Sequence, residues 1–507
     1  MYANVSAVTA LSVAERALGF LYRIVLSRLI GAEGLGLYQI ALSVFSTFLT
    51  IGTGGIPVTV SRMITKSRAE KDARGESGAV TAGICLSLLL TLPFCLLFGI
   101  FGKAFGFLFS DERGLRVFQI LLIGLVFSSI YAVLRGSFWG RKEFLLPSIL
   151  EIAEESVMVI VGVLLLQNVE NAVAGAEKAA WAAVISYLFS FSASALCFRL
   201  KKRKLSSPKN YLKPLFNATL PITSVRACGT LINAAVAVLL PAMLIRAGAS
   251  ESESLQLFGV VSGMAIPLLF IPATLIGSMA LVLVPELSEA FYKKDFARLQ
   301  KNIERGLSFA FLIACVLIPF FAVLGEDIGK IAFANELAGE IIAKSAPLLL
   351  PMSITMISTG ILNSMGFEKQ SLVFYFFGEA AMLACILFLP AYCGVYAYVA
   401  GLGASYIVNA VCNFAFLQRH CPIFSKNMQA TRLQSLFFLA TTLFTVLLSG
   451  GLLSKLLKNI FGEILAFVCT GVCMAISTAL CYAFTGILPI KDFLRQFCKK
   501  RIKNSKK

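Results

Sequence analysis

The sequence predicts an all-α polytopic membrane protein with fourteen transmembrane helices. Hydrophobic residues make up 58% of the 507 residues, charged residues make up only 14%, and the mean hydropathy is +0.83. These values exclude a soluble globular protein. The apolar runs are about 20 residues long, which is the length a helix needs to cross the hydrocarbon core, whereas a β-barrel would show short alternating segments.

The apolar runs divide the chain into spans joined by short loops. We expect these spans at residues 5–30, 37–61, 79–101, 117–139, 147–167, 179–198, 214–244, 256–285, 306–324, 341–364, 371–390, 395–417, 433–453 and 461–486. The segment GTGG at 52–55, followed by Pro57, predicts a bend in the second span. No basic segment precedes the first span, which predicts an uncleaved anchor rather than a signal peptide.

Basic residues alternate along the loops. Most of the 45 lysines and arginines fall in loops that would share one side of the membrane. Because such residues favour the cytoplasmic side, the alternation predicts that both termini are cytoplasmic and that the number of spans is even. The same distribution accounts for the net charge of +18 without a nucleic-acid partner.

The two halves of the chain resemble one another. The residues Arg16 to Gly19 in the first span are similar to Arg226 to Gly229 in the seventh, and a second match makes Glu154 and Glu379 equivalent. Each half would begin inside and hold six spans, which predicts two parallel lobes, related by a pseudo-two-fold axis, around a central cavity. The predicted parts are an N-lobe, a basic cytoplasmic linker, a C-lobe, a terminal pair of spans and a basic cytoplasmic tail, at residues 1–198, 199–213, 214–417, 418–490 and 491–507.

The first span carries more charge than a lipid-facing helix tolerates. Arg16, Arg23 and Arg28 lie in an otherwise apolar segment, and each would cost roughly 2.5–3.5 kcal/mol at the bilayer centre. Arg16 and Arg23 share one narrow helical stripe with Gly19, which predicts a side that faces water or an anionic ligand. The alternative interpretation is that the arginines pair with acids on other helices, or reach the headgroups, and only fix the packing.

Acidic residues are embedded as well. Glu154 lies with two other glutamates on one face of the fifth span, Glu379 lies at a comparable depth in the eleventh, and Glu15 precedes Arg16. We expect Glu15, Glu154 and Glu379 to act in coupling or gating, by protonation or by cation binding. The alternative is that the glutamates form internal salt bridges with the arginines.

The sequence lacks the residues that several kinds of chemistry require. The thirteen cysteines form no C-x-x-C pair, and the one histidine, His420, adjoins only Cys421, which excludes a four-ligand zinc site. The sequence contains no G-x-x-x-x-G-K-[ST] motif and no Ser/His/Asp constellation. The sequence therefore predicts a transporter rather than an enzyme. We expect no cofactor, a monomer, and Na⁺ or H⁺ as the candidate coupling ion.

The residues from Arg16 to Tyr38, RALGFLYRIVLSRLIGAEGLGLY, carry a family resemblance together with Ile56-Pro57-Val58 and Ser61-Arg62. They resemble the stage V sporulation protein B and polysaccharide biosynthesis branch of the multidrug/oligosaccharidyl-lipid/polysaccharide exporter superfamily, which is related to lipid II flippases. The resemblance implies two six-helix lobes plus a terminal helix pair. It also implies alternating access that flips an undecaprenyl-pyrophosphate-linked glycan precursor outward.

The resemblance further implies substrate-binding residues. In that family, arginines of the first helix and of the seventh or eighth helix are proposed to contact the pyrophosphate, which implies Arg16, Arg23 and Arg226 here. Related lipid II flippases carry an arginine followed by an acid in the first helix, whereas this chain has Tyr22-Arg23. A shift by one residue turns a helical side chain by about 100 degrees, which favours Arg16 over Arg23.

Three functions stay open at the level of the sequence. The leading hypothesis is a flippase for a lipid-linked cell-wall or polysaccharide precursor, driven by the membrane potential or an ion gradient. The second is a multidrug/cation antiporter of the same superfamily, against which the embedded arginines argue. The third is a scaffold in envelope synthesis that transports nothing. A role in sporulation rests on the resemblance alone.

Overall fold

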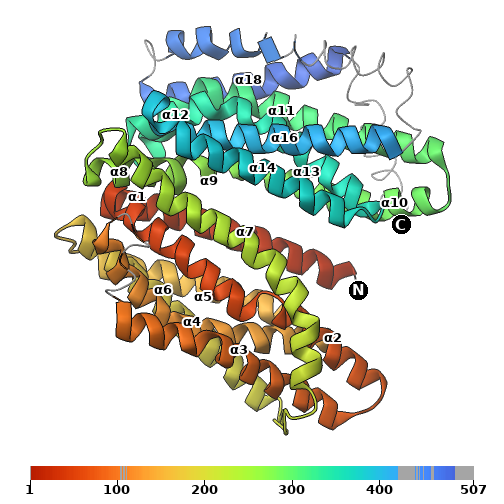
Figure 1. The fold of residues 1–507 in the computed structure, drawn as a ribbon. Coiled ribbons are helices and arrows are strands. Elements are labelled where there is room, and N and C mark those ends of the chain that lie inside the picture. Colours follow the sequence, from red (N-terminus) through yellow and green to blue (C-terminus); the bar gives the residue numbers. More distant parts are fainter. Residues whose placement is uncertain are drawn as a thin grey trace, which may run out of the picture. The chain divides into compact units, whose positions relative to one another are not determined.

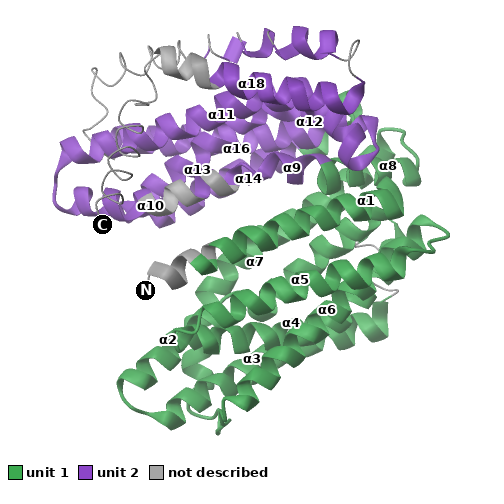
Figure 2. Ribbon diagram, turned by 180° about the vertical axis from the view of Figure 1, so that it is seen from behind, with its two compact units in different colours: residues 1–264, 386–395 green, residues 265–385, 396–507 purple. Residues whose placement is uncertain are grey.

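The computed structural model shows a helical chain (Figure 1). It describes residues 2–102, 106, 109, 111–420, 440, 443–444, 446–448, 450–457 and 462–485, and these residues include no β-strand. The helices form two compact units, which are residues 1–264 with 386–395 (unit 1) and residues 265–385 with 396–507 (unit 2) (Figure 2). The predicted all-α fold class is confirmed.

Unit 1 holds most of the residues that the sequence analysis singles out. Its helices are α1 (Tyr2–Thr53), α2 (Ile56–Ala69), α3 (Ala73–Phe101), α4 (Glu112–Gly140), α5 (Leu145–Leu166), α6 (Ala172–Leu200), α7 (Leu212–Arg246), α8 (Glu251–Phe258) and the short α15 (Pro390–Cys393). The side chains of Asp72, Asp111 and Asn171 each accept a hydrogen bond from a first-turn N–H, which explains where α3, α4 and α6 begin.

Helix α1 covers both the first span and most of the second, because it bends where a loop was expected. Gly31 has φ 69° and ψ −178° within the helix, a conformation that a residue with a side chain rarely adopts. The helix ends at Thr53, and α2 begins at Ile56 with Pro57 in its first turn. The bend predicted at residues 52–57 is therefore confirmed as a break between two helices, whereas the loop expected before residue 37 is an elbow at Gly31.

The apolar faces of α2, α3 and α4 enclose the core of unit 1. Val60, Val133 and Phe138 from these helices are completely buried, and Phe198 of α6 and Leu215 of α7 pack against them. In a membrane, close packing of this kind holds helices together, because lipid is as apolar as the side chains. The packing fixes the C-terminal half of α4 and thereby positions the charged residues described below.

Unit 2 begins inside a helix. The chain passes from unit 1 to unit 2 within a π-helical turn, η2 (Gly259–Ala265), which follows α8. The remaining elements are α9 (Ile266–Phe270), α10 (Ala273–Tyr292), α11 (Phe296–Phe333), α12 (Glu336–Ser345), the 3₁₀ turn η3 (Ala346–Leu348), α13 (Leu349–Ser364), α14 (Glu368–Phe388), α16 (Tyr396–His420) and α18 (Glu463–Thr485). The eighth predicted span, 256–285, is thus divided among several short helices, with Pro267 in the first turn of α9.

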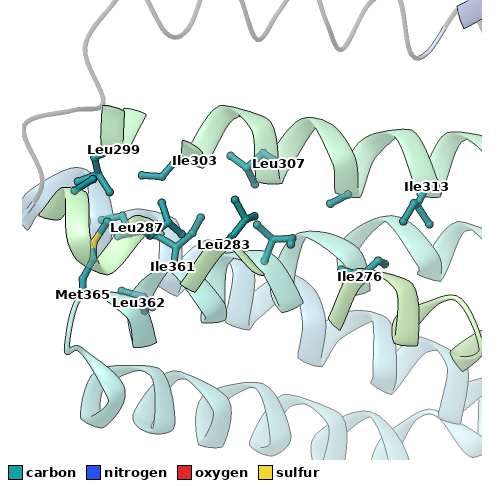
Figure 3. Packing of buried hydrophobic residues seen from close by; sticks show 14 residues of the cluster. Ile276, Leu283, Leu287, Leu299, Ile303, Leu307, Ile313, Ile361, Leu362 and Met365 are labelled. Carbon is teal, nitrogen blue, oxygen red and sulfur yellow. The ribbon is translucent and has the colours of Figure 1, made fainter. Parts of the chain in front are cut away.

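The core of unit 2 lies between α10, α11 and α13. Leu283 and Leu287 of α10, Ile303 of α11 and Ile361 of α13 point toward one another and are at most 5% exposed (Figure 3). Leu417 of α16 is completely buried in the same cluster.

Ten helices in the described part of the chain are long and apolar enough to cross a membrane. Helix α5 is not among them, and it carries three glutamates in 22 residues. The count of fourteen stays a prediction. Part of the thirteenth span, the end of the fourteenth and the predicted tail at 491–507 lie outside the described residues.

The predicted lobes and the observed units divide the chain differently. The lobes follow the sequence repeat and separate at the 199–213 linker, whereas the units separate between residues 264 and 265. Helix α7 belongs to unit 1 because it packs along α1, where the Thr47 hydroxyl donates to the carbonyl of Thr230 at 3.0 Å. The lobe boundaries stay a prediction about the repeat.

Candidate functional site

The polar stripe of α1 faces the acidic face of α5. A Cβ atom added to Gly19 would lie 2.8 Å from Oε1 of Glu155, so the α5 carboxylate lies directly over the glycine. Glu155 also interacts electrostatically with Arg23, which lies four residues further along the stripe. The predicted cationic helix and the predicted acidic helix are therefore neighbours, and Gly19 gives the carboxylate room between them.

Arg135 of α4 joins the two helices from the side. Its Nη1 donates to Oε1 of Glu151 at 2.8 Å, and the two side chains are 30% and 19% exposed. The Arg135 guanidinium lies 5.8 Å from the ring centre of Tyr131 and 5.0 Å from that of Trp139, one helical turn to either side. These cation–π contacts and the ion pair hold the guanidinium in one place.

Three polar atoms in this region are buried and have no hydrogen-bond partner within the described residues. They are Nε of Arg135, Oη of Tyr131 and Oε2 of Glu154. Glu154 lies beside Ser190 of α6 and close to the charge of Glu155. Since buried polar groups are as a rule paired, three unpaired atoms in one region mark hydrogen-bonding capacity for water, an ion or a substrate.

Glu15 and Arg16 lie at the edge of the same region. Glu15 is partly buried and lies within electrostatic range of Arg135 and Glu151, whereas Arg16 is exposed. We call the whole group the α1–α5 cluster, and its members are Glu15, Arg16, Arg23, Arg135, Glu151, Glu154 and Glu155. The structure thus brings together four of the predicted site residues, and carboxylates outnumber guanidiniums four to three.

Arg226 lies elsewhere in unit 1, at the break between α1 and α2. Its Nη1 donates to the carbonyl of Gly54 at 2.7 Å, and the Thr223 hydroxyl one turn earlier accepts from the N–H of Gly55 at 3.0 Å. A cation at the C-terminal end of a helix interacts favourably with the helix dipole. Arg226 therefore has a structural partner, and its exposed side chain is directed by that contact.

Glu379 lies in α14 of unit 2 and does not belong to the α1–α5 cluster. It is 9% exposed and lies beside the hydroxyls of Tyr375, one turn earlier, and Ser405 of α16. Within the described ranges, no group of three or more His, Cys, Asp and Glu side chains is arranged to hold a metal ion.

Arg135 is the member of the cluster that sequence reasoning missed. It lies near the end of the fourth predicted span, 117–139, where the sequence gives it no role, and the structure places it inside α4, five residues before the helix ends at Gly140. The spacing of Tyr131, Arg135 and Trp139 by four residues is the signal that could have placed it, because it puts both rings on the same helical face as the guanidinium.

Comparison with known proteins identifies the family. Residues 1–291, more than half of the chain, match the family described as polysaccharide biosynthesis protein. The chain belongs to this family. Stage V sporulation protein B of Bacillus subtilis (strain 168) is 26% identical over 359 residues, which are 67% of this chain and 68% of that protein. Lipid II flippase MurJ of the same strain is 22% identical over 444 residues, which are 80% of each chain.

A solved structure supports the same fold for this polysaccharide biosynthesis protein. Lipid II flippase MurJ in an inward closed conformation aligns with a TM-score of 0.72 at 12% identity, over 94% of this chain and 99% of that one. The family and the fold confirm membership of the multidrug/oligosaccharidyl-lipid/polysaccharide exporter superfamily. The chain is accordingly a multi-pass membrane protein with the fold of that flippase.

Proposed function

We propose that this protein flips an undecaprenyl-pyrophosphate-linked cell-wall or polysaccharide precursor from the cytoplasmic to the outer leaflet by alternating access. The observation that carries the proposal is the α1 stripe, on which Arg16 is exposed and Arg23 is half-buried toward Glu155. The proposal includes cytoplasmic termini and a monomeric state. The relatives named lipid II flippase and stage V sporulation protein B support it.

A guanidinium suits the headgroup of such a lipid. Arginine presents N–H donors in a planar fork that matches two phosphate oxygens, and it stays charged in a poorly hydrated site. Arg16, being exposed, is the first contact, and Arg23 lies seven residues further along the same stripe, which is nearly two helical turns. Arg226 would exchange its contact with the Gly54 carbonyl for the pyrophosphate.

Coupling is assigned to the carboxylates of the same cluster and to Glu379. Glu154 has one buried oxygen without a partner, and a proton or a small cation would satisfy it. Binding there would change the balance of charge against Arg23 and Arg135, and so change the affinity of α1 for an anion. Glu15 would modulate Arg16 directly, and Glu379 would serve the second unit. The coupling ion is Na⁺ or H⁺.

A second candidate is a cation antiporter, and the charge of the α1–α5 cluster is the observation that favours it. The cluster holds four carboxylates against three guanidiniums, and Glu151 already pairs with Arg135. A cationic drug would find carboxylates and aromatic rings there. The two candidates predict opposite responses to loss of Arg16, because removing a positive charge weakens binding of an anion and strengthens binding of a cation.

Transport into proteoliposomes tests the proposal. We expect Arg16→Ala and Arg226→Ala each to slow the movement of a labelled lipid-linked pyrophosphate at least about tenfold, the range for loss of a charge-assisted hydrogen bond. Lys202→Ala is the matched control, because Lys202 is an exposed loop cation of unit 1. Transport at the normal rate by both arginine variants would show that the substrate site is elsewhere.

A further inference from the structure

A second group of charges, two of them nearly buried, lies outside the membrane-spanning segments, where the α4–α5 turn meets the chain that leaves α6. We call it the turn cluster, and its members are Arg68, Glu76, Arg141, Glu143, Lys201 and Arg203. Glu143 accepts from Nζ of Lys201 and from Nη2 of Arg203, both at 2.6 Å. Nε of Arg141 donates to Glu76 at 3.2 Å. This end of unit 1 is the one that the basic loops predict to be cytoplasmic.

Arg203 is buried to an unusual degree for a loop arginine. Its side chain is only 9% exposed, and its guanidinium lies 4.8 Å from the ring centre of Phe138 and 5.8 Å from that of Phe198. Nη2 is used by Glu143, but Nη1 is buried with no hydrogen-bond partner among the described atoms. The rings and Glu143 thus hold a guanidinium rigidly while one of its donor nitrogens stays unsatisfied.

Arg141 lies next to Arg203 and is 11% exposed. Burial, and then the positive charge of Arg203, lower the pKa of Arg141 below its usual value. Nη1 of Arg68 also approaches this point and donates to the carbonyl of Arg141 at 3.2 Å. Four cations therefore share two carboxylates, and the excess positive charge is concentrated where two guanidiniums are least hydrated. A bound anion would relieve both the repulsion and the unsatisfied donor.

Apolar side chains next to the turn cluster narrow the choice of anion. Phe144 follows Glu143 directly and is 48% exposed, Leu200 precedes Lys201 and is 71% exposed, and Leu205 is 57% exposed. Exposed apolar groups beside buried cations fit a ligand with an anionic head and a hydrocarbon body. A soluble anion would use the cations and leave the apolar groups without a partner.

We propose that Arg141, Lys201 and Arg203 bind the phosphate of an anionic phospholipid whose hydrocarbon chains lie against Phe144, Leu200 and Leu205. The phosphodiester oxygens accept from the Lys201 ammonium at the surface, and from Nη1 of Arg203 when the side chains that cover this nitrogen move aside. Glu143 keeps Arg203 oriented and is a positioning residue. The site is separate from the α1–α5 cluster, so this proposal does not depend on which substrate the protein flips.

Native mass spectrometry of the full chain in detergent tests the proposal directly. The purified protein is titrated with phosphatidylglycerol and, separately, with phosphatidylcholine, and bound lipid is counted. We expect one phosphatidylglycerol to bind at least about tenfold more tightly than phosphatidylcholine, and Arg203→Gln to abolish that preference, as loss of a charge-assisted contact implies. Lys204→Gln is the matched control, because Lys204 is an exposed cation of the same segment and its loss changes the net charge equally.

Other outcomes are equally informative. Equal weakening by Arg203→Gln and Lys204→Gln, or no preference for phosphatidylglycerol, would overturn the site and leave only general attraction to a basic surface. Binding of inorganic phosphate as tightly as phosphatidylglycerol would overturn the assignment of the site to a lipid. If Arg203→Gln does not fold, Lys201→Gln decides, because Lys201 is 42% exposed and its replacement removes a phosphate contact from the surface. Unchanged lipid binding by Lys201→Gln would then contradict the proposal.

Discussion

The α1–α5 contact of unit 1 and the α13–α16 contact of unit 2 embed different kinds of polar group. In unit 1, the α1–α5 cluster contains charges of both signs, and several of its buried atoms have no partner among the described residues. In unit 2, the contact between α13 and α16 is neutral, because Nδ2 of Asn413 donates to the hydroxyls of Ser358 and Thr359 at 2.9 and 3.2 Å. Glu379 is the one charged residue of α13, α14 and α16 that lies away from the helix ends.

This difference indicates which of the two contacts is more costly, in free energy, to embed in the membrane. A neutral hydrogen bond between membrane helices contributes about 0.6 kcal/mol on average, so the contact at Asn413 mainly sets how α13 and α16 pack. Charges in the membrane are far more costly and are kept where they serve a substrate or an ion. Under the proposed function, we therefore expect the contacts with the headgroup to lie in unit 1.

The largest effect on stability is expected from separating the ion pair of unit 1. Glu151→Leu leaves the guanidinium of Arg135 embedded without its carboxylate, and we expect a loss of about 2 kcal/mol of unfolding free energy, below the full cost for a completely buried pair. Thermal unfolding in detergent measures it. The double variant Glu151→Leu/Arg135→Leu should recover most of the loss. If the double variant is as unstable as the single one, packing rather than charge explains Glu151.

The equivalent change in unit 2 should cost less. Asn413→Leu removes two hydrogen bonds but leaves no charge behind, and we expect a loss of about 1 kcal/mol by the same measurement. Asn413 is completely buried, so Asn413→Asp serves as the contrasting variant that introduces a charge at the same place. A cost for Asn413→Leu that equals or exceeds that of Glu151→Leu would remove the distinction between the units.

A substitution with a smaller expected effect on stability tests the role of the contact between α1 and α5. Gly19→Ala places a methyl group against Glu155, whose carboxylate is the mobile end of a side chain and can move aside. We expect a stability change within about 0.5 kcal/mol, partly offset by the better helix propensity of alanine, together with slower transport. Gly99→Ala in α3 is the control, since nothing lies within 4 Å of the added atom. Normal transport by Gly19→Ala would count against a role for this contact.

The smallest effect concerns charges of unit 1 that lie outside the spanning segments. Burial raises the pKa of Glu143, but the hydrogen bonds and charges of Lys201 and Arg203 together lower it by more. The net pKa is therefore below the usual 4.5. The folded chain therefore binds this proton less readily than the unfolded chain. The stabilisation is present above pH 4.5 and is lost as the pH falls through the lower folded value.

Melting temperatures of the wild type and Glu143→Gln check this sign. The difference in melting temperature should be constant near neutral pH and should shrink as the pH falls below 4.5. The corresponding change in the free energy of unfolding is about a few tenths of a kcal/mol, because Glu143 is partly exposed. A difference that grows on acidification would contradict the ion pairing of Glu143 with the segment after α6.

The sequence could predict the fold class because hydropathy and loop charge act over whole spans. It also predicted the break near Gly54 from local glycine and proline. It could not predict that α7 packs with unit 1, because that depends on contacts such as Thr47 with Thr230, which are far apart in the chain. Arg135 was missed for a related reason, since its partner Glu151 is on the next helix and only the packing of α4 against α5 brings them together.

Transport of two different cargoes by proteoliposomes that contain the same protein tests the central claim most directly. One set carries a labelled undecaprenyl-pyrophosphate glycan in the donor leaflet, and the other carries a fluorescent organic cation. We expect the wild type to move the lipid-linked pyrophosphate faster than Arg16→Ala does, and neither protein to move the cation above the rate of empty vesicles. Export of the cation by the wild type, with faster export by Arg16→Ala and no movement of the lipid, would contradict it.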